Sequence, residues 1–262
     1  RQHPDAKIVA FVHAETSTGV QSDAQTLCAL AKAHDCLTIV DCVTSLAGTE
    51  VALDAWGADA AYSGTQKCLS CAPGLSPISL SQRAVDTVKS RKAPVSSWFL
   101  DLNLVMGYWG EGQTRSYHHT APVNALYGLH EALVVLHEEG LASSWSRHAR
   151  NHNALKAGLE AMGLTFVVPE AERLPQLNLV SVPEGVDEAS VRKQLLQQYN
   201  LEIGAGLGSL AGRVWRIGLM GFASNPKNVL FCVNALEAVL SQYNAPIHRG
   251  VATGAVQAAY KA

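Results

Sequence analysis

The sequence predicts an α/β fold in which helices cover both faces of a mixed, mostly parallel sheet, followed by a smaller α+β domain. Three observations predict it. Apolar, strand-like runs alternate with helical stretches up to about residue 92, as in a sheet covered by helices. The pattern is helical from about 122 to 162. Shorter strands and helices follow. We therefore assign residues 1–139 to a large domain and residues 140–262 to the smaller one.

The elements of the first part follow from local composition. Strands are expected at 8–13, 37–41, 58–63 and 75–80, and a helix at 22–35. Ser22 or Asp23 can begin the helix, because either side chain can accept a hydrogen bond from a first-turn amide. Pro77 cannot donate a ladder hydrogen bond, so the fourth strand is expected at an edge or in an irregular position.

The second part is richer in helices. Helices are expected at 122–139, 142–162, 187–199 and 225–242, and strands at 164–168, 177–182 and 213–218. Gly140 and Gly163 end the first two helices, because glycine readily takes the left-handed conformation found there. The last helix has one apolar stripe with the spacing of a buried helix face. Its residues are Val229, Val233, Leu236 and Leu240. Residues beyond about 244 are small and weakly patterned, so we expect a tail.

The composition argues against several classes of partner. The chain has 262 residues, 48% of them apolar, which is enough for a sizeable core. A formal net charge of −2 gives no basic excess, so neither nucleic acid nor an anionic membrane surface is expected as the main partner. No apolar run approaches the ~18 residues that a membrane-spanning helix needs.

The six cysteines are scattered, and no secretory signal is recognisable. Reduced thiols in a cytoplasmic protein are the expectation. Cys68 and Cys71 form a C-x-x-C, which is either a redox or metal pair or two small residues that pack behind an active-site strand. We favour packing, because a zinc site would need a second such pair and the sequence has none.

Asp41 closes the apolar strand LTIVD, at the strand end where α/β enzymes bind ligands. A buried carboxylate needs a partner. One interpretation is a helix cap or a structural ion pair. The other is a partner for a cationic ring nitrogen, as in pyridoxal enzymes, whose protonated ring is the electron sink of the reaction.

Lys67 follows the small-residue strand ADAAYS, in the segment YSGTQK. Lysine is rarely buried, because burial of its charge is costly. A lysine in such a place can lower its pKa and attack an aldehyde. The alternative is a side chain that extends from the strand end to the surface.

The third feature is HAETSTG at 13–19, which follows the first strand. Its hydroxyls and glycine suit an ordinary turn, and equally a turn that binds an anion or a cofactor oxygen. Asp41 follows Thr16 by 25 residues, and Lys67 follows Asp41 by 26. This order of strand-end groups resembles the fold-type I pyridoxal phosphate enzymes.

Four segments carry a closer resemblance. HAETSTGV, IVDCVTSLAGTEVALDAWGADAAYSGTQKCL, RSYHHTAPV and RIGLMG resemble the class V aminotransferases of the alanine–glyoxylate and serine–pyruvate type. The resemblance runs from the first residues to about 243. It implies pyridoxal 5′-phosphate as the cofactor.

The resemblance also implies roles for single residues. Lys67 matches the Schiff-base lysine of the family, and Gln66 a residue that contacts the cofactor phosphate. Asp41 matches the carboxylate paired with the pyridinium nitrogen, and Val43 the aliphatic side chain on the ring. Thr16 stands where the family usually has serine beside the cofactor's O3′ region, so a hydroxyl is retained with an extra methyl group.

Tyr117 and Thr120, in YHHT, match residues that reach the phosphate of the neighbouring subunit, so a homodimer is implied. A metal site at His118 and His119 is the competing interpretation. We reject it, because adjacent histidines generally diverge and no carboxylate motif accompanies them. No metal is expected.

Arg216 lies in the apolar segment VWRIGLMG. Strand alternation places it on one face with Val214 and Gly218, opposite Trp215 and Ile217. In the family this arginine binds the substrate α-carboxylate, and a planar guanidinium suits two carboxylate oxygens. The alternative is a buried arginine–carboxylate ion pair.

Two parts of the family's cofactor site fall upstream of Arg1, namely the glycine-rich turn for the phosphate and the aromatic residue stacked on the ring. The chain begins without Met and enters a strand almost at once, which indicates a chain cut inside a domain. We expect these 262 residues alone to bind the cofactor poorly.

The resemblance implies ping-pong transfer of an amino group from alanine or serine to glyoxylate or a related 2-oxo acid. Lys67 moves the proton of the substrate α-carbon as base and then acid. Aminotransferases for ureidoglycine or aminoethylphosphonate are alternatives. Cysteine desulfuration is another, although desulfurases usually have histidine where this chain has Gln66. A truncated, non-catalytic relative is the last. The chain does not end in a Ser-Lys-Leu-type signal, so a cytoplasmic location is expected.

Overall fold

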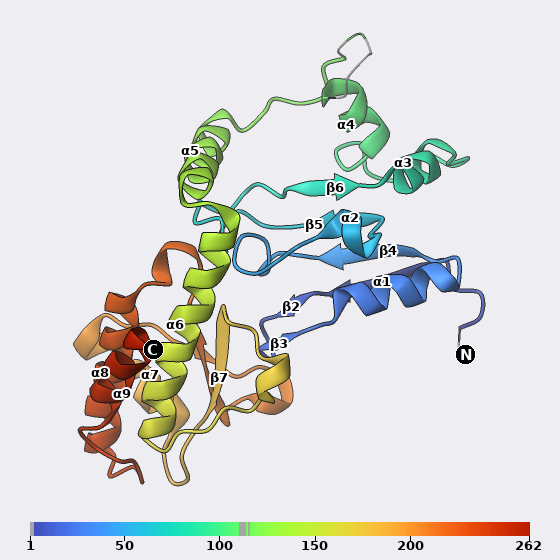
Figure 1. The fold of residues 1–262 in the computed structure, drawn as a ribbon. Helices are drawn as coiled ribbons and strands as arrows, with labels where there is room; N and C mark the ends of the chain where they lie inside the picture. Colours follow the sequence, from blue (N-terminus) through green and yellow to red (C-terminus); the bar gives the residue numbers. More distant parts are fainter. Residues whose placement is uncertain (1–2, 110–113, 115) are drawn as a thin grey trace.

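The computed structural model describes residues 3–109, 114 and 116–262, and contains two principal sheets (Figure 1). The first sheet is mixed, with three parallel strands and an antiparallel fourth. Its strands, in spatial order, are β1 (Ile8–Val12), β4 (Leu37–Asp41), β5 (Ala60–Tyr62) and β6 (Ile78–Leu80). All four expected strands are present, and β6 lies at an edge directly after Pro77, as that proline predicts.

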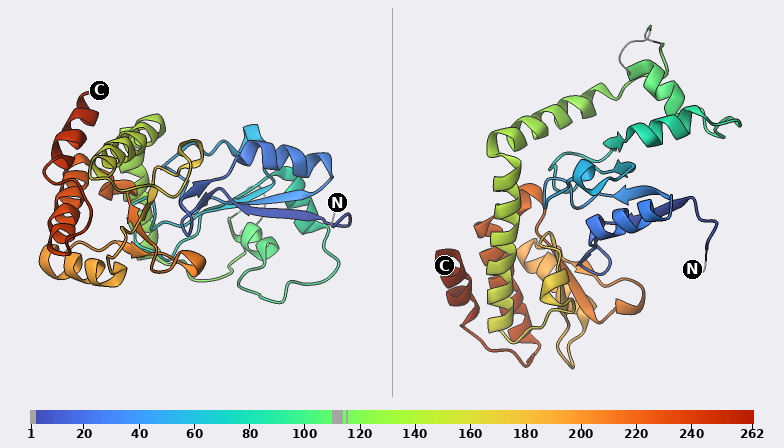
Figure 2. Two further views of the ribbon diagram at one scale, coloured as in Figure 1. Left: turned by 90° about the horizontal axis from the view of Figure 1, so that it is seen from below. Right: turned by 45° about the vertical axis from the view of Figure 1, so that its right-hand side comes forward.

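Helices flank this sheet. α1 (Ala24–Ala33) begins at Asp23, whose side chain accepts a hydrogen bond from the amide of Thr26, so Asp23 is the N-cap. In the left view of Figure 2, α1 lies on one side of the strands and α4 on the other. The other helices of this part are α2 (Leu53–Trp56), α3 (Gln82–Lys89) and α4 (Leu102–Trp109).

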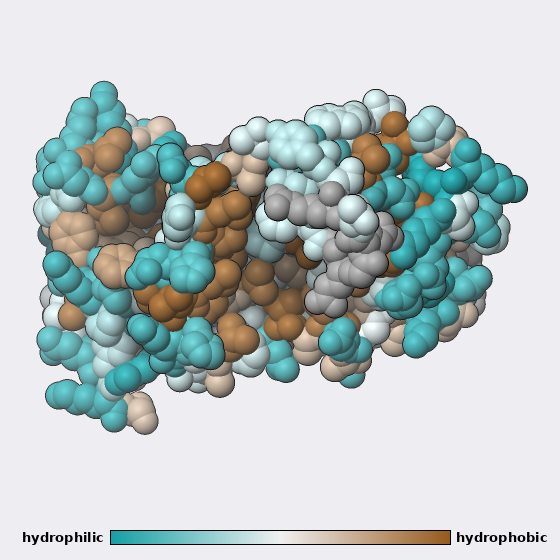
Figure 3. All heavy atoms as spheres, turned by 90° about the horizontal axis from the view of Figure 1, so that it is seen from above, coloured by the Kyte–Doolittle hydropathy of each residue, from teal (hydrophilic) through white to brown (hydrophobic). Residues whose placement is uncertain are grey.

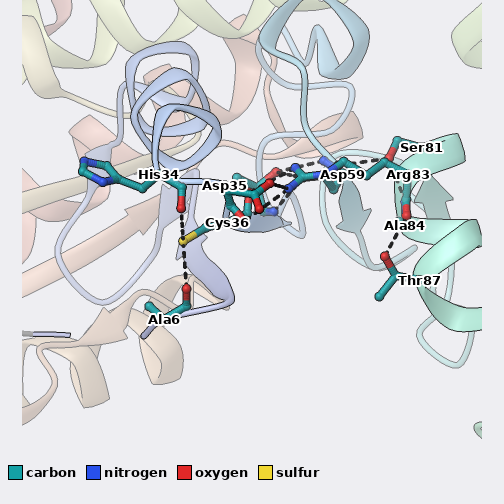
Figure 4. A network of polar contacts seen from close by, with 10 residues as sticks. Ala6, His34, Asp35, Cys36, Asp59, Ser81, Arg83, Ala84 and Thr87 are labelled. Carbon is teal, nitrogen blue, oxygen red and sulfur yellow. Dashed lines mark hydrogen bonds and ion pairs between the residues drawn. The ribbon is translucent and has the colours of Figure 1, made fainter. Parts of the chain in front are cut away.

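A polar network joins the amino ends of β4 and β5 (Figure 4). Asp59 is buried and accepts hydrogen bonds from the amide of Thr38 (2.9 Å) and from Nη1 of Arg83 (3.2 Å). Arg83, on α3, also forms an ion pair with Asp35 (3.1 Å). Because it satisfies a buried carboxylate, this network helps to hold the two strands in register at the end opposite the site described below.

The second sheet is antiparallel, with β9 in its centre. Its strands are β7 (Leu177–Ser181), β9 (Val214–Gly218) and β8 (Gly204–Ala205). Trp215 and Ile217 point into the largest core, whereas Val214 packs with Ala14 in a second cluster. The alternation expected along β9 is therefore confirmed, and Arg216 lies on the side of Val214.

Helices enclose the largest core. They are α6 (Leu141–Ala161), α7 (Glu188–Tyr199), α8 (Pro226–Gln242) and α9 (Ala252–Lys261). α5 (Val123–Glu139) precedes α6 and contributes no residue to this core. The stripe expected on α8 is fully buried. α5 passes into α6 at Gly140, where φ is +84°. The domain boundary at this point stays a prediction.

Two expectations for the second part are wrong. Residues 164–168 form no strand; they make a single bridge, between Phe166 and Val180. The expected tail beyond 244 contains α9, which packs on α6. A Cβ on Gly158 of α6 would lie 2.6 Å from Val256 of α9, so the helices meet where a side chain is missing. The small residues of α9 show no clear helical spacing of apolar side chains in the sequence, but they permit this close packing.

A hollow lined by apolar side chains lies beside α5. Its volume is about 780 Å³. The side chains come from α5 and from the segments after β4 and β5, and include Leu46, Leu69, Leu126, Leu129 and Leu133. Figure 3 shows apolar side chains gathered around a hollow on the upper side of the molecule. Within the described residues, no helix has the length and apolarity needed to cross a membrane.

Candidate active site

The carboxyl ends of neighbouring parallel strands bring the predicted site residues to one edge of the first sheet. Val12, Asp41 and Tyr62 are in register across β1, β4 and β5. The segments that carry Thr16, Val43 and Lys67 leave these strands at the same edge. This is the edge at which open α/β sheets bind ligands.

Asp41 is half-buried and accepts two hydrogen bonds. Its Oδ1 accepts from the amide of Val43 (2.8 Å), and its Oδ2 from the hydroxyl of Tyr62 (2.8 Å). Both donors are neutral, and no ion pair to Asp41 occurs in the part of the chain that the structure describes. The carboxylate fixes the turn after β4, but among the described residues it neither caps a helix nor forms an ion pair, so its negative charge has no positive partner there.

Tyr62 is a site candidate that sequence reasoning missed. It is directly opposite Asp41 in the register of β4 and β5. The hydrogen bond to the Asp41 carboxylate raises the pKa of Tyr62, so the phenol stays protonated and donates. The motif YSGTQK contains this residue, but its partner is visible only once the strand register is known.

Lys67 is half-buried in the loop that follows β5. The loop is fixed by internal hydrogen bonds, from Thr65 Oγ1 to the carbonyl of Ala72 (2.6 Å) and from the amide of Ser70 to the carbonyl of Lys67 itself (3.0 Å). Over the described residues, Nζ of Lys67 has no hydrogen-bond or ion-pair partner. A rigid loop therefore presents a free amine.

Gln66 and Val43 flank these groups. Gln66 is exposed, and its side chain folds over Gly64, where an added Cβ would lie 2.7 Å from Oε1. Val43 is half-buried in the turn after Asp41. Their roles toward the phosphate and the ring stay predictions.

Thr16 and Arg216 meet across the two sheets. Thr16 lies in the tight turn between β2 (Ala14–Glu15) and β3 (Val20–Gln21). Arg216 Nη1 donates to the carbonyl of Thr16 (3.1 Å), and Nε donates to the carbonyl of Ala205 (2.6 Å). The structure thus brings together the hydroxyl turn and the arginine, which are 200 residues apart in sequence.

Arg216 is half-buried and forms no ion pair with a carboxylate of the described chain. The described residues thus give no support to the alternative of a structural arginine–carboxylate pair. Gly204 leaves room beside the guanidinium, because a Cβ there would lie 3.5 Å from Nη2. An oriented guanidinium without an anion is suited to bind a carboxylate from outside the chain.

His13 closes β1 and is buried against Trp56, with the two rings edge to face at 5.0 Å. Burial lowers the pKa of His13 to about 4, so the imidazole is neutral at pH 7. Its Nδ1 is buried without a hydrogen-bond partner in the described chain. His13 thus packs beneath the Thr16 turn as an uncharged group.

Tyr117 and Thr120 bind each other and not the strand-end groups. The Tyr117 hydroxyl and Thr120 Oγ1 are 2.7 Å apart, and both residues are exposed. No described hydrogen bond or ion pair joins them to Lys67, Asp41 or Arg216. Arg115, which begins their motif, lies outside the described residues.

The two adjacent histidines converge, contrary to expectation. The Nδ1 atoms of His118 and His119 are 2.7 Å apart, and His118 stacks on Trp98 with ring centroids 4.1 Å apart. In the C-x-x-C, Cys68 is buried and its thiol donates to the carbonyl of Thr44 (3.2 Å). Burial raises the pKa of Cys68 to about 12, which agrees with a packing role.

The charges of the site suit a pyridoxal cofactor. Asp41 offers an uncompensated anion to a cationic ring nitrogen, Lys67 a free amine to an aldehyde, and Arg216 a guanidinium to a carboxylate. No hydrogen bond or ion pair joins any two of these three groups in the described chain. Groups that are costly to leave without a partner are thus aimed at one edge.

Comparison with known proteins gives a consistent family. The family model described as Aminotransferase class-V matches residues 2–224. The (S)-ureidoglycine–glyoxylate transaminase of Bacillus subtilis is 39% identical over 273 residues, covering 97% of this chain and 65% of that protein. The alanine–glyoxylate aminotransferase of Callithrix jacchus is 40% identical, covering 89% of this chain and 57% of that protein.

Solved structures agree with this. The ureidoglycine–glyoxylate aminotransferase of Bacillus subtilis matches with a TM-score of 0.94 at 41% identity, covering 98% of this chain and 66% of that one. The alanine–glyoxylate aminotransferase of Nostoc sp. matches with a TM-score of 0.88 at 48% identity, covering 91% and 63%. The chain thus spans less than two thirds of the length of these relatives.

Proposed function

The chain belongs to the class V aminotransferases, and we propose that its protein transfers an amino group from alanine or serine to glyoxylate or a related 2-oxo acid. The observation that carries this proposal is a set of three groups without a charged partner in the described chain. Asp41 and Lys67 lie at one edge of the first sheet, and Arg216 reaches from β9 to the Thr16 turn at the same edge. The cofactor of the family is pyridoxal 5′-phosphate. The segments that resemble the alanine–glyoxylate type support the choice of substrates.

Each of the three groups has a separate task. Lys67 holds the cofactor, and its freed Nζ takes the proton from the substrate α-carbon and returns a proton later. Asp41 keeps the ring nitrogen protonated, with Tyr62 orienting its carboxylate through the 2.8 Å hydrogen bond. When bound, pyridoxal phosphate supplies a ring that stabilises negative charge at the α-carbon.

Arg216 binds the substrate carboxylate. Its Nε and Nη1 are held by the carbonyls of Ala205 and Thr16, which orients the guanidinium before the substrate arrives. Preorganised donors lose little conformational entropy on binding. Val43, Thr16 and Gln66 are proposed to contact the ring, its O3′ region and the phosphate.

The second candidate is transfer from ureidoglycine. The Bacillus subtilis protein named for this reaction aligns over 97% of this chain, and the alanine–glyoxylate protein of Callithrix jacchus over 89%. Both names contain glyoxylate, so the acceptor is common to the two candidates. The donor is what separates them.

We also propose a homodimer, in which Tyr117 and Thr120 reach the cofactor phosphate of the neighbouring subunit. Both side chains are exposed, are hydrogen-bonded to each other, and make no polar contact with the strand-end groups of their own chain. The cytoplasmic location stays a prediction.

Steady-state kinetics of the complete protein loaded with pyridoxal phosphate test the reaction. Alanine, serine, ureidoglycine and 2-aminoethylphosphonate are each paired with glyoxylate, and glycine is measured. We expect alanine or serine to give the highest kcat/KM, with parallel double-reciprocal plots. Preference for ureidoglycine would establish the second candidate, and absence of glycine with every donor would refute both. Release of sulfide from cysteine would instead indicate a desulfurase.

A further inference from the structure

A row of polar side chains lies on one face of α6, where apolar residues would be expected. Its members are spaced 3, 1 and 3 residues apart and are Ser144, Arg147, His148 and Asn151. This spacing places them on one side of a helix. Three are fully or almost fully buried, and Arg147 is half-buried. We call this row the α6 polar face.

The α6 polar face binds the turn at residues 221–224, which we call the Gly221 turn. Nε2 of His148 accepts from the amide of Gly221 (2.9 Å). Nη1 of Arg147 donates to the carbonyls of Gly221 (2.7 Å) and Ser224 (2.8 Å). Asn151 Nδ2 donates to Ser224 Oγ (3.2 Å). The Gly221 turn begins three residues after β9, the strand that carries Arg216.

The same turn binds the Lys67 loop on its other side. The amide of Phe222 donates to Ser70 Oγ (2.8 Å), and the amide of Ser70 donates to the carbonyl of Lys67 (3.0 Å). A Cβ on Gly221 would lie 2.0 Å from Ser70 Oγ and 3.1 Å from the carbonyl oxygen of Cys68. The contact is therefore a close backbone approach that only glycine allows, and φ of Gly221 is also positive, at +54°.

The hydrogen bonds define the state of His148. Its Nε2 receives an amide N–H, and its Nδ1 lies 2.7 Å from the carbonyl oxygen of Ser144. A carbonyl can only accept, so Nδ1 carries the proton and the ring is neutral. Burial lowers the pKa of His148, in agreement. The neighbouring Arg147 is itself held by a two-point ion pair with Glu139, the last residue of α5.

A third segment is attached to the same face. Ser144 Oγ donates to the carbonyl of Ala47 (2.7 Å), in the segment that follows β4 and Asp41. α6 therefore contacts the backbone after β4 directly, the backbone after β9 directly, and the Lys67 loop through Ser70. These three connections join the two sheets close to the proposed reaction groups.

We propose that Ser70 and His148 are positioning residues that set the separation between Lys67 and Arg216 through the Gly221 turn. This inference rests on the proposed function. An amino acid carries its amino and carboxylate groups on one carbon, so both protein groups must fit one short, rigid spacing. A misplacement of about 1 Å can cost ~10²-fold in rate.

A changed separation between Lys67 and Arg216 should weaken a ligand that contacts both groups more than a ligand that contacts Arg216 alone. Alanine needs Lys67 and Arg216 together, whereas propionate has the carboxylate alone and needs only Arg216. In Ser70→Ala the hydroxyl is lost, while the strained backbone at φ +57° is as tolerable for alanine as for serine. We expect KM for alanine to rise ~10-fold, since one hydrogen bond is lost, with the Kd of propionate and cofactor loading within about twofold of wild type.

His148 provides the second pair of variants. His148→Leu removes the acceptor for Gly221, and His148→Gln restores an acceptor at a similar reach. We expect His148→Leu to raise KM for alanine, and His148→Gln to recover most of the loss. Ser146→Ala is the matched control, because Ser146 is an exposed serine of α6 without a hydrogen bond in the described chain.

The experiment uses the complete protein loaded with pyridoxal phosphate, with steady-state rates for alanine, absorbance titration of the bound cofactor with propionate, and hydrogen exchange of residues 67–71 and 219–222. Unchanged alanine kinetics in Ser70→Ala, or equal weakening of alanine and propionate, would overturn the proposal. A wild-type protein that does not transaminate would refute the proposed function instead. In that case hydrogen exchange still tests whether Ser70 connects the two segments. Faster exchange of residues 67–71 and 219–222 in Ser70→Ala would support the connection, and unchanged exchange would reject it.

Discussion

α5 and α8 have the same length, 17 residues each, but opposite surroundings. α8 buries seven side chains in the largest core, whereas α5 buries none. α5 also exposes large apolar side chains, including Val123, Tyr127, Leu133 and Val135. The core beneath α8 is complete within this chain. α5, which begins three residues after Thr120, carries exposed apolar side chains that the proposed homodimer would cover.

The largest expected effect tests whether α5 belongs to a shared site. Lys67→Ala should reduce transamination at least ~10³-fold, because the proton-transferring amine is lost. Tyr117→Phe combined with Thr120→Val should weaken cofactor binding through the neighbouring subunit. Mixed and allowed to exchange subunits, the two variants should recover about a quarter of wild-type activity, since half the dimers then hold one intact site.

Recovery is measured as glycine formation after subunit exchange, with circular dichroism as a check that each variant is folded. Failure to recover above the sum of the separate variants would place Tyr117 and Thr120 in the site of their own chain. The exposed apolar side chains of α5 would then have no assigned part in a shared active site.

A second mixture of variants is the control in which no recovery of activity is expected. Arg216→Ala should raise KM for the amino donor about 10²-fold, because two charge-assisted hydrogen bonds to the carboxylate are lost. Arg216 contacts the carbonyl of Thr16 in the same chain. Lys67 and Arg216 therefore serve one site, and a mixture of Lys67→Ala with Arg216→Ala should show no recovery. Recovery in the same glycine assay would contradict this assignment to a single chain.

Stability measurements sharpen the comparison of the two helices. Leu236 of α8 is 0% exposed and Leu133 of α5 is 46% exposed. We expect Leu236→Ala to lower the free energy of unfolding by about 2–5 kcal/mol, and Leu133→Ala to change it by less than about 0.5 kcal/mol in the dissociated protein. Urea unfolding at low protein concentration measures both. Equal losses would mean that α5 is already covered within one chain.

The last expected effect is a pH dependence of stability. Burial lowers the pKa of His13, to about 4, and also lowers those of His148 and His152. Between the unfolded value of about 6.5 and pH 4, the unfolded chain binds more protons, so the free energy of unfolding falls as the pH falls. His13 alone should contribute up to about 3 kcal/mol.

The measurement is urea unfolding at several pH values between 7.5 and 4.5. His13→Gln should flatten the decline relative to wild type, and His130→Gln, at an exposed position of α5, is the matched control. Identical slopes for His13→Gln and wild type would show that the buried imidazole does not drive the effect.

Local patterns predicted the elements that bury a regular apolar face. β4 and the stripe on α8 have the predicted residues, because alternation and helical spacing are properties of neighbouring residues. The strand-end positions of Asp41 and Lys67 followed for the same reason. α9 was missed because its small residues form no apolar stripe in the sequence. They pack closely only against Gly158 of α6, almost 100 residues earlier in the chain.

Partners distant in sequence explain the other omissions. Tyr62 meets Asp41 only through the register of two strands, and Ser70 meets Phe222 across 152 residues. Arg216 was predicted from its unusual place in an apolar strand, but its contact with Thr16 was not. Motifs thus indicated the candidate chemical groups, whereas the residues that hydrogen-bond to them became visible only in the three-dimensional arrangement.

The packing of α9 on α6 also affects how the protein is made. Tyr260 binds Arg150 and Asn151, which are 110 and 109 residues earlier in the chain. At ribosomal rates of about 5–20 residues per second, α6 waits roughly 5–20 s for this partner during synthesis. Over that interval the bare side of α6 is available to other nascent chains. The interval from α6 to α9 is therefore the period in which we expect the growing chain to need a chaperone most.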